Sequence, residues 1–215
     1  MSQTKVAVGM IDATGTPGSG NFLRGDAAWS TPTGALVFIS NTDFSTTATY
    51  DFESFTAGSY EHYQFHLQNL IPATDDVHLW CRTSTDGGSN YDDGASDYDW
   101  TINHTSIHHT DALVDQDLAS AQISLTGDHT STNVTIGSTT VESGVSGVIQ
   151  LFGPHTTSYT HVLAHLIGIS AIASPNVFHS TGVRLSAGDV DGFRLLFESG
   201  TIESGTVTAY GLVNA

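Results

Sequence analysis

An acidic, glycine-rich stretch between residues 86 and 99 carries the side chains of this sequence best suited to chemistry. It contains five carboxylates among Gly, Ser and Asn residues: Asp86, Asp92, Asp93, Asp97 and Asp99. Calcium prefers several oxygen ligands, and carboxylates on a turn-rich loop can surround it. The spacing departs from that of an EF-hand, because no Glu closes the loop. The stretch is therefore either a calcium site or a solvated loop whose Asp and Gly residues provide turn geometry.

Aromatic residues on and near this stretch indicate a second kind of candidate site. Tyr91 and Tyr98 lie within it, and Trp80 occupies an outward position of a preceding strand pattern. Flat rings with a polar edge suit contacts with a sugar or with a neighbouring chain. We expect these three residues to be candidates for ligand binding.

The eleven histidines of the chain raise the question of a metal centre. A zinc site needs three or four converging ligands. His161 and His165 share a face if their segment is a strand, but they are then more than roughly 12 Å apart along it. We interpret the histidines as scattered surface or interface residues, and no cofactor is expected beyond the candidate calcium ion.

Patterns typical of enzymes are missing. There is no Gly-x-Ser-x-Gly nucleophile elbow and no phosphate-binding loop with its lysine. Acidic residues are too numerous for any pair of them to indicate glycoside cleavage. The sequence therefore predicts a protein that is not an enzyme.

The formal net charge of −17, from 22 acidic and 5 basic residues, limits the partners. Binding to nucleic acid or to an anionic membrane requires a basic stripe that five scattered cations cannot form. No apolar run reaches membrane-spanning length, and no signal peptide is recognisable at the start. We therefore expect synthesis in a host cytoplasm, without nucleic-acid binding or membrane insertion.

Two regions differ in organisation. Residues 1–33 contain a Gly- and Pro-rich stretch followed by the apolar residues Phe22, Leu23 and Trp29, which a segment this short cannot bury on itself. They predict an extended arm that contacts another chain, although a terminal arm packed on its own domain is the alternative. Residues 34–215 show period-two alternation, clearest over residues 60–70, and ten or so strand-like runs separated by turn residues. The pattern predicts an all-β fold: an antiparallel, jelly-roll-like β-sandwich.

Two local predictions concern strand and helix assignment. Residues 193–197 and 206–212 read as a β-hairpin, with Phe193, Leu195 and Phe197 on one face that Val207 and Ala209 continue. The only segment suited to a helical turn is 111–120.

Three passages resemble structural proteins of bacteriophage virions. Residues 21–32, NFLRGDAAWSTP, resemble the FLRGDGTW-x-x-P segment of tail-fibre and related proteins, with Ala27 where Gly or Asn is common. Residues 190–212 resemble a terminal pattern GI-x-F-x-x-x-S-G-N-I-x-S-G-x-x-x-x-Y-G, with Thr201 in place of Asn. Residues 63–88 resemble Y-x-F-x-L-x-N-L-x-P-A followed by L-x-x-R-x-S-T-D-G-G.

This resemblance covers about half the chain and implies a virion location, a jelly-roll-like head domain and a homotrimer. It leads us to expect a fibre, spike or tail-tip component whose arm docks on other virion proteins and whose sandwich contacts a host-surface glycan or a neighbouring virion protein. The alternative is a capsid decoration protein that stabilises the head shell.

Overall fold

The computed structural model describes residues 22–23, 28–30, 36–56, 58–106, 113–127 and 134–213. The chain divides into two units, Met1–Ala35 and Leu36–Ala215, close to the predicted boundary at residue 33. The first unit contains β1 (Phe22–Leu23) and β2 (Trp29–Ser30), which pair antiparallel with Leu23 opposite Trp29.

The second unit is built from strands alone within the described residues. Its strands are β3 (Leu36–Thr47), β4 (Tyr50–Phe52), β5 (Tyr60–Pro72), β6 (Leu79–Ser84), β7 (Tyr98–Ser106), β8 (Leu113–Ser120), β9 (Ile123–Ser124), β10 (Val145–Phe152), β11 (His161–Ile169), β12 (Pro175–Arg184), β13 (Gly192–Phe197) and β14 (Ile202–Val213). The predicted all-β antiparallel sandwich is confirmed. Across the part of the chain that the structure describes, there is no helix of the length and hydropathy needed to span a bilayer.

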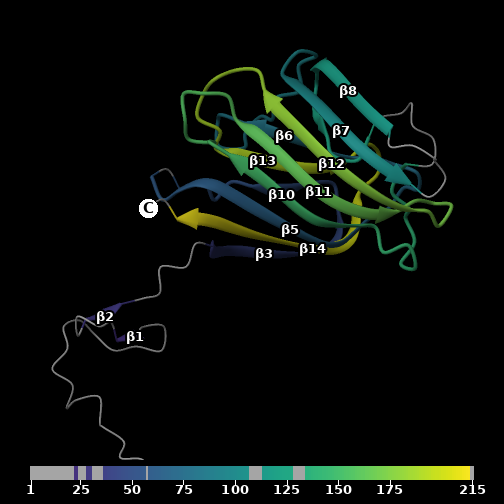
Figure 1. The fold of residues 1–215 in the computed structure, drawn as a ribbon, viewed down its shortest axis with the longest axis horizontal. Coiled ribbons are helices and arrows are strands. Elements are labelled where there is room, and N and C mark those ends of the chain that lie inside the picture. The colour runs from purple at the N-terminus through teal and green to yellow at the C-terminus, as the bar shows by residue number, and fades with distance from the viewer. Residues whose placement is uncertain are drawn as a thin grey trace, which may run out of the picture. The chain divides into compact units, whose positions relative to one another are not determined.

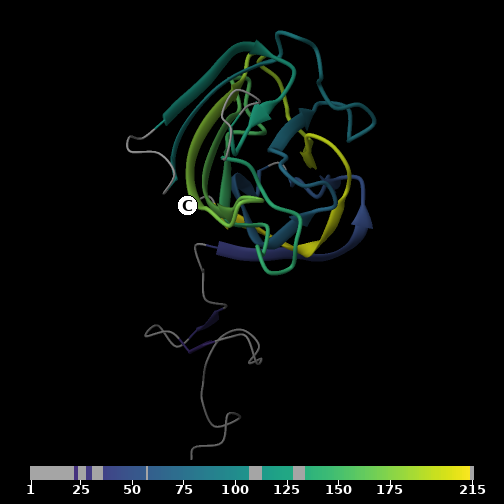
Figure 2. The same ribbon diagram turned by 90° about the vertical axis from the view of Figure 1, so that its right-hand side faces the viewer.

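The strands form two antiparallel sheets that face each other (Figures 1 and 2). One has the order β3-β14-β5-β10-β11-β12-β7-β8, and the other the order β4-β13-β6-β9. Within this arrangement, β3-β14-β5-β10 faces β4-β13-β6-β9, and the chain alternates between the two groups as in a jelly roll. Two antiparallel pairs, β7–β8 and β11–β12, extend the larger sheet beyond this jelly-roll part.

The core lies between the sheets and follows the predicted alternation. On β5, the inward residues Tyr63, Phe65 and Leu67 are almost fully buried. Phe65 stacks on Phe193 of the opposite sheet, with ring centroids 4.6 Å apart. Period-two patterning therefore identified the inward positions of this strand correctly. Just before β6, His78 departs from such alternation, because it is buried between the buried residues Val77 and Leu79, and its Nδ1 lies 3.1 Å from the carbonyl oxygen of Thr126.

Two local predictions are wrong. β13 and β14 do not form a hairpin: β13 pairs with β4 and β6, whereas β14 pairs with β3 and β5 in the other sheet. Their apolar residues therefore meet across the core instead of lying side by side. The chain crosses between the sheets at residues 198–201, where Gly200 has a φ of +79° that favours glycine. The helical turn expected at 111–120 is also wrong over its described part, because Leu113–Ser120 is β8.

Candidate binding surface

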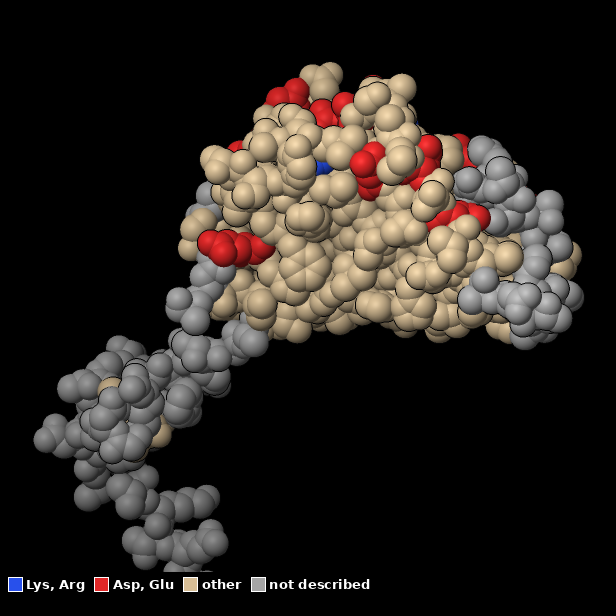
Figure 3. Space-filling model, turned by 45° about the horizontal axis from the view of Figure 1, so that its top comes forward, with Lys and Arg blue, Asp and Glu red and all other residues tan. Residues whose placement is uncertain are grey.

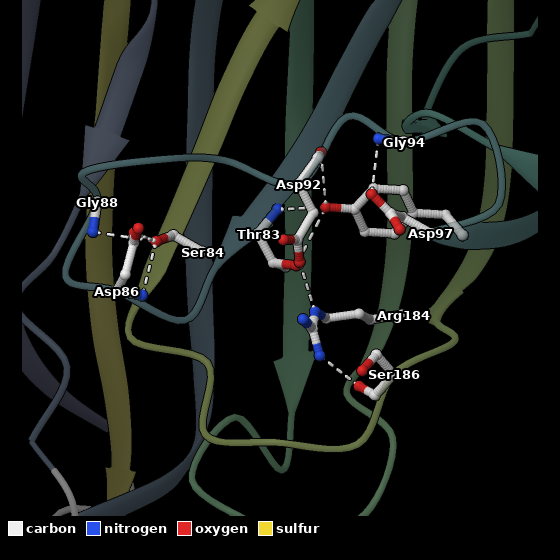
Figure 4. Close-up of polar contacts among 10 residues, drawn as sticks. Thr83, Ser84, Asp86, Gly88, Asp92, Gly94, Asp97, Arg184 and Ser186 are labelled. Atoms are coloured by element: carbon white, nitrogen blue, oxygen red, sulfur yellow. Dashed lines mark hydrogen bonds and ion pairs between the residues drawn. The ribbon is translucent and has the colours of Figure 1, made fainter.

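The acidic stretch forms a loop between β6 and β7 that is held by its own hydrogen bonds (Figure 4). The Asp86 carboxylate accepts hydrogen bonds from the Ser84 hydroxyl at 2.8 Å and from the backbone and side-chain nitrogens of Asn90 at 2.8 and 2.7 Å. These bonds, led by that from the Asn90 side chain, hold the pKa of Asp86 below its ordinary value. Asp97 accepts a hydrogen bond from the backbone N–H of Gly94 at 2.7 Å.

The remaining carboxylates of the loop point to separate partners. Asp92 pairs with the Arg184 guanidinium at 2.6 Å, and the same guanidinium also donates to the carbonyl of Ser186 (Figure 4). Asp93 lies 3.7 Å from Arg82, and Asp99 accepts a hydrogen bond from the backbone of Ala119 on β8.

These separate partners draw the carboxylates of the acidic stretch in different directions. The described residues contain no group of three or more His, Cys, Asp or Glu side chains placed to hold a metal ion. The contacts of the five carboxylates are hydrogen bonds and ion pairs within the loop and to the adjoining strands: Asp86, Asp92, Asp93, Asp97 and Asp99. The carboxylates fail to converge because each one is used to hold the loop or the adjoining strands.

Two of the candidate ligand-binding rings, Tyr91 on the loop and Tyr98 at the start of β7, are buried. Tyr98 is fully buried, and its hydroxyl accepts a hydrogen bond from Thr83 N at 2.8 Å and donates to the carbonyl of Asp92 at 3.2 Å. Tyr91 is 8% exposed, and the Arg194 guanidinium lies 3.8 Å above the centre of its ring. Burial raises the pKa of both hydroxyls. Trp80, on β6, is half-buried and is the only one of the three with substantial exposed surface.

The predicted contact residues of the arm lie in the first unit. Phe22, Leu23 and Trp29 belong to the β1–β2 pair, and Leu23 is 39% exposed. The side chains of Phe22 and Trp29 lie outside the described residues.

A different surface emerges on the outer face of the eight-stranded sheet, which faces the viewer in Figure 1. On its four central strands, β5, β10, β11 and β12, the outward positions contain no Asp, Glu, Lys or Arg. They carry glutamine, threonine, aliphatic and aromatic residues together with His62, His66, His161, His165 and His179. Figure 3 looks obliquely at the domain and shows a broad area without charged side chains, with acidic side chains near its margin. In a chain of net charge −17, this distribution is strongly uneven.

At least two open hollows lie on this face. One, of about 390 Å³, lies where the β7–β8 extension meets β12, and its lining includes Thr101, Gln116, Leu118, His161 and Thr181 together with one carboxylate, that of Asp99 on β7. The other, of about 310 Å³, is more apolar and is lined in part by Ile167, Pro175 and Val177. Both volumes fall in the range of small-molecule sites.

Apart from Asp99 at the larger hollow, the chemistry available on this face is that of binding through neutral groups. Amide and hydroxyl side chains donate and accept hydrogen bonds, and Tyr210 and Phe152 add aromatic surface next to them. The period-two alternation over residues 60–70 distinguishes the outward residues of β5 from its buried ones: His62, Gln64, His66 and Gln68. Recognising the whole surface required the order of the strands, which has no signal in the sequence.

Comparison of the chain with protein-family models, with curated proteins and with solved structures gives no match.

Proposed function

We propose that this protein is a non-enzymatic structural component of a bacteriophage virion, in which the N-terminal arm attaches to other virion proteins and the β-sandwich binds a host-surface glycan. The observation that carries the proposal is the absence of Asp, Glu, Lys and Arg from the outward positions of the four central strands of the eight-stranded sheet, on an otherwise strongly acidic chain. The likeness of three sequence passages to phage fibre and spike proteins supplies the virion location.

The glycan part of the proposal rests on the residue types of this face. Gln116, Thr101 and Thr181 line the larger hollow with groups that suit sugar hydroxyls, and Leu118 supplies apolar surface beside them. A net charge of −17 repels acidic polysaccharides at low ionic strength, so a neutral glycan is the favoured ligand class. Weak affinity at each site suffices, because many copies on one particle act together.

The alternative, a capsid decoration protein, is favoured by a different observation. Ile167 and Val177 are opposite each other on β11 and β12 and are 59% and 39% exposed beside the apolar hollow. Exposed aliphatic residues around a shallow hollow suit contact with a protein surface. In that case the same face would clamp shell subunits.

Binding to an array of neutral and acidic bacterial polysaccharides tests the proposal. We expect the full-length chain to retain neutral glycans. Thr181→Glu should weaken retention at least about tenfold, because it buries a charge beneath the ligand. The matched control is Val141→Glu, a loop residue that is 87% exposed and lies outside the hollow, and it should bind as the unchanged protein does.

Other outcomes distinguish the two candidate functions. If the protein binds no glycan but raises the melting temperature of phage capsids mixed with it, the capsid decoration function is supported and the glycan-binding function is contradicted. Release of reducing ends from a bound polysaccharide would show turnover and overturn the non-enzymatic part of the proposal.

A further inference from the structure

Two histidines meet on the outer face of the eight-stranded sheet. His165 on β11 and His179 on β12 are directly opposite in the antiparallel register. Their Nδ1 atoms are 2.7 Å apart, their ring planes are inclined by 78°, and both side chains are exposed. The backbone pairing of two interior strands holds the two Cβ atoms at the short separation of a cross-strand pair.

We propose that His165 and His179 form a binding site for a late first-row divalent transition metal ion, copper or nickel. Two imidazole nitrogens about 2.0–2.1 Å from one ion, at a right angle, lie about 2.9 Å apart. The observed separation of 2.7 Å needs only a small side-chain rotation to reach that value. Water completes the coordination, since both rings face solvent.

Proton balance is simple at this site. In the neutral pair, the Nδ1–H group of one ring donates a hydrogen bond to the Nδ1 atom of the other ring. When the ion binds, that proton moves to Nε2 of the same ring, so that both Nδ1 lone pairs face the metal and both Nε2–H groups face water. No proton need be lost and no redox step is involved.

The surroundings favour this class of ion over hard cations. In the same cross-strand row, the outward neighbours are Val148 and Asn103, neither of which is a carboxylate. Calcium and magnesium require oxygen ligands, whereas imidazole nitrogens suit copper and nickel, with copper bound most tightly. The negative charge of the whole protein raises the local concentration of cations near the face.

The test uses the tag-free, full-length protein in a weakly coordinating buffer that contains no amine ligand, so that any nitrogen bound to the ion comes from the protein. We expect calorimetry with Ni²⁺ to give one ion per chain, and the spectrum of bound Cu²⁺ to show coupling to two nitrogens. Ni²⁺ should also raise the melting temperature, because it binds the folded chain preferentially. Ca²⁺ at the same concentration should give no binding in calorimetry and no rise in the melting temperature.

Three variants decide the assignment. His165→Gln and His179→Gln should each abolish the one-equivalent binding and the rise in melting temperature, while circular dichroism confirms that the fold is retained. His161→Gln, which changes an exposed histidine of the same strand and face, should bind as the unchanged protein does. The proposal is overturned if either pair variant binds Ni²⁺ normally, or if His161→Gln loses binding equally.

Discussion

At the scale of single residues, His62 on the outer face should make the stability of the fold depend on pH. Its ring stacks on Phe152 of β10, with centroids 4.3 Å apart, and its Nε2 has no hydrogen-bond partner among the described residues. Burial lowers its pKa below the ordinary value of 6.5, because water no longer solvates the charged form well. In the unfolded chain the ring takes up a proton near the ordinary pKa, whereas the folded chain does so only at lower pH. The free energy of unfolding therefore falls as the pH is lowered through about 6.5.

Replacement of His62 by Phe should reduce the loss of stability that accompanies a fall in pH. We expect denaturant midpoints measured at pH 7.5 and pH 5.0 to differ less in His62→Phe than in the unchanged protein. His161→Phe serves as a comparison, since that histidine is exposed on the neighbouring part of the same face. An equal reduction in both variants would show that the effect does not come from the buried ring.

Two adjacent aspartates of the acidic loop should differ sharply in their effect on stability. Asp92 pairs at 2.6 Å with Arg184, whose side chain is 9% exposed, so Asp92→Ala leaves a buried guanidinium without its carboxylate. We expect the free energy of unfolding to fall by about 2 kcal/mol. Asp93 is 71% exposed and 3.7 Å from Arg82, so Asp93→Ala should change it by less than about 0.5 kcal/mol. Urea titration of the two variants measures both values, and similar losses would contradict this account.

The same loop marks how far residue types alone predict a site. Its composition indicated a loop rich in turns, which is correct, and left calcium ligation as an alternative. The three-dimensional partners of the carboxylates, such as Arg184 from β12 and Asn90 within the loop, have no local signal in the sequence. Tyr98 was taken for an exposed ring because the period of its strand does not reveal which face is covered.

At the scale of elements, alternation predicted strands and their inward faces well, and predicted pairing poorly. The inward residues of β5 agree with the sequence pattern. In contrast, β13 and β14 looked like a hairpin because they are close in sequence and separated by Gly-bounded turns, yet they lie in opposite sheets. The His165–His179 contact was missed for the same reason. The expected distance between His161 and His165 was sound, but the partner comes from the next strand through a register that no local pattern encodes.

A single glycine sets the close approach of two strands from different sheets. A methyl group added at Gly182 on β12 would lie 2.4 Å from Cγ2 of Ile123 on β9, a fully buried side chain. We expect Gly182→Ala to lower the free energy of unfolding by about 1–3 kcal/mol through overpacking. Ile123→Ala alone should cost about 2–5 kcal/mol through the cavity that it leaves.

The double variant tests whether these effects share one space. The added methyl group of Gly182→Ala would enter the cavity left by Ile123→Ala, so the two losses should sum to more than the loss of the double variant. Chemical denaturation of all four proteins gives the coupling energy. Additive losses would mean that the two residues do not limit the approach of the strands.

At the scale of the whole molecule, the strand order places the candidate binding features on the outer face of the eight-stranded sheet, whose central strands carry no charged outward residues. The β7–β8 and β11–β12 pairs widen one sheet of the jelly roll, and they provide most of the lining of the larger hollow and both residues of the histidine pair. The acidic loop lies between β6 and β7, and its carboxylates are used for the loop and neighbouring strands. Composition determines the large negative net charge, but the uneven distribution of that charge follows from the strand order.

The assembly of the full chain should depend on the arm. β1 and β2 contain two residues each, too few to form a stable unit by themselves. We therefore expect Phe22, Leu23 and Trp29 to become buried between copies of the chain, giving a homotrimer in sedimentation equilibrium. Because each copy carries a net charge of −17, repulsion opposes assembly, and added salt should strengthen the trimer by screening this repulsion.

Replacing the three arm residues by Ser should give monomers whose sandwich melts as before. The same replacement at three exposed sandwich residues, Val114, Val141 and Val213, should leave the trimer intact. A monomer for the unchanged protein at every salt concentration would refute the role of the arm in trimerisation, because burial of these apolar side chains is its only proposed driving force.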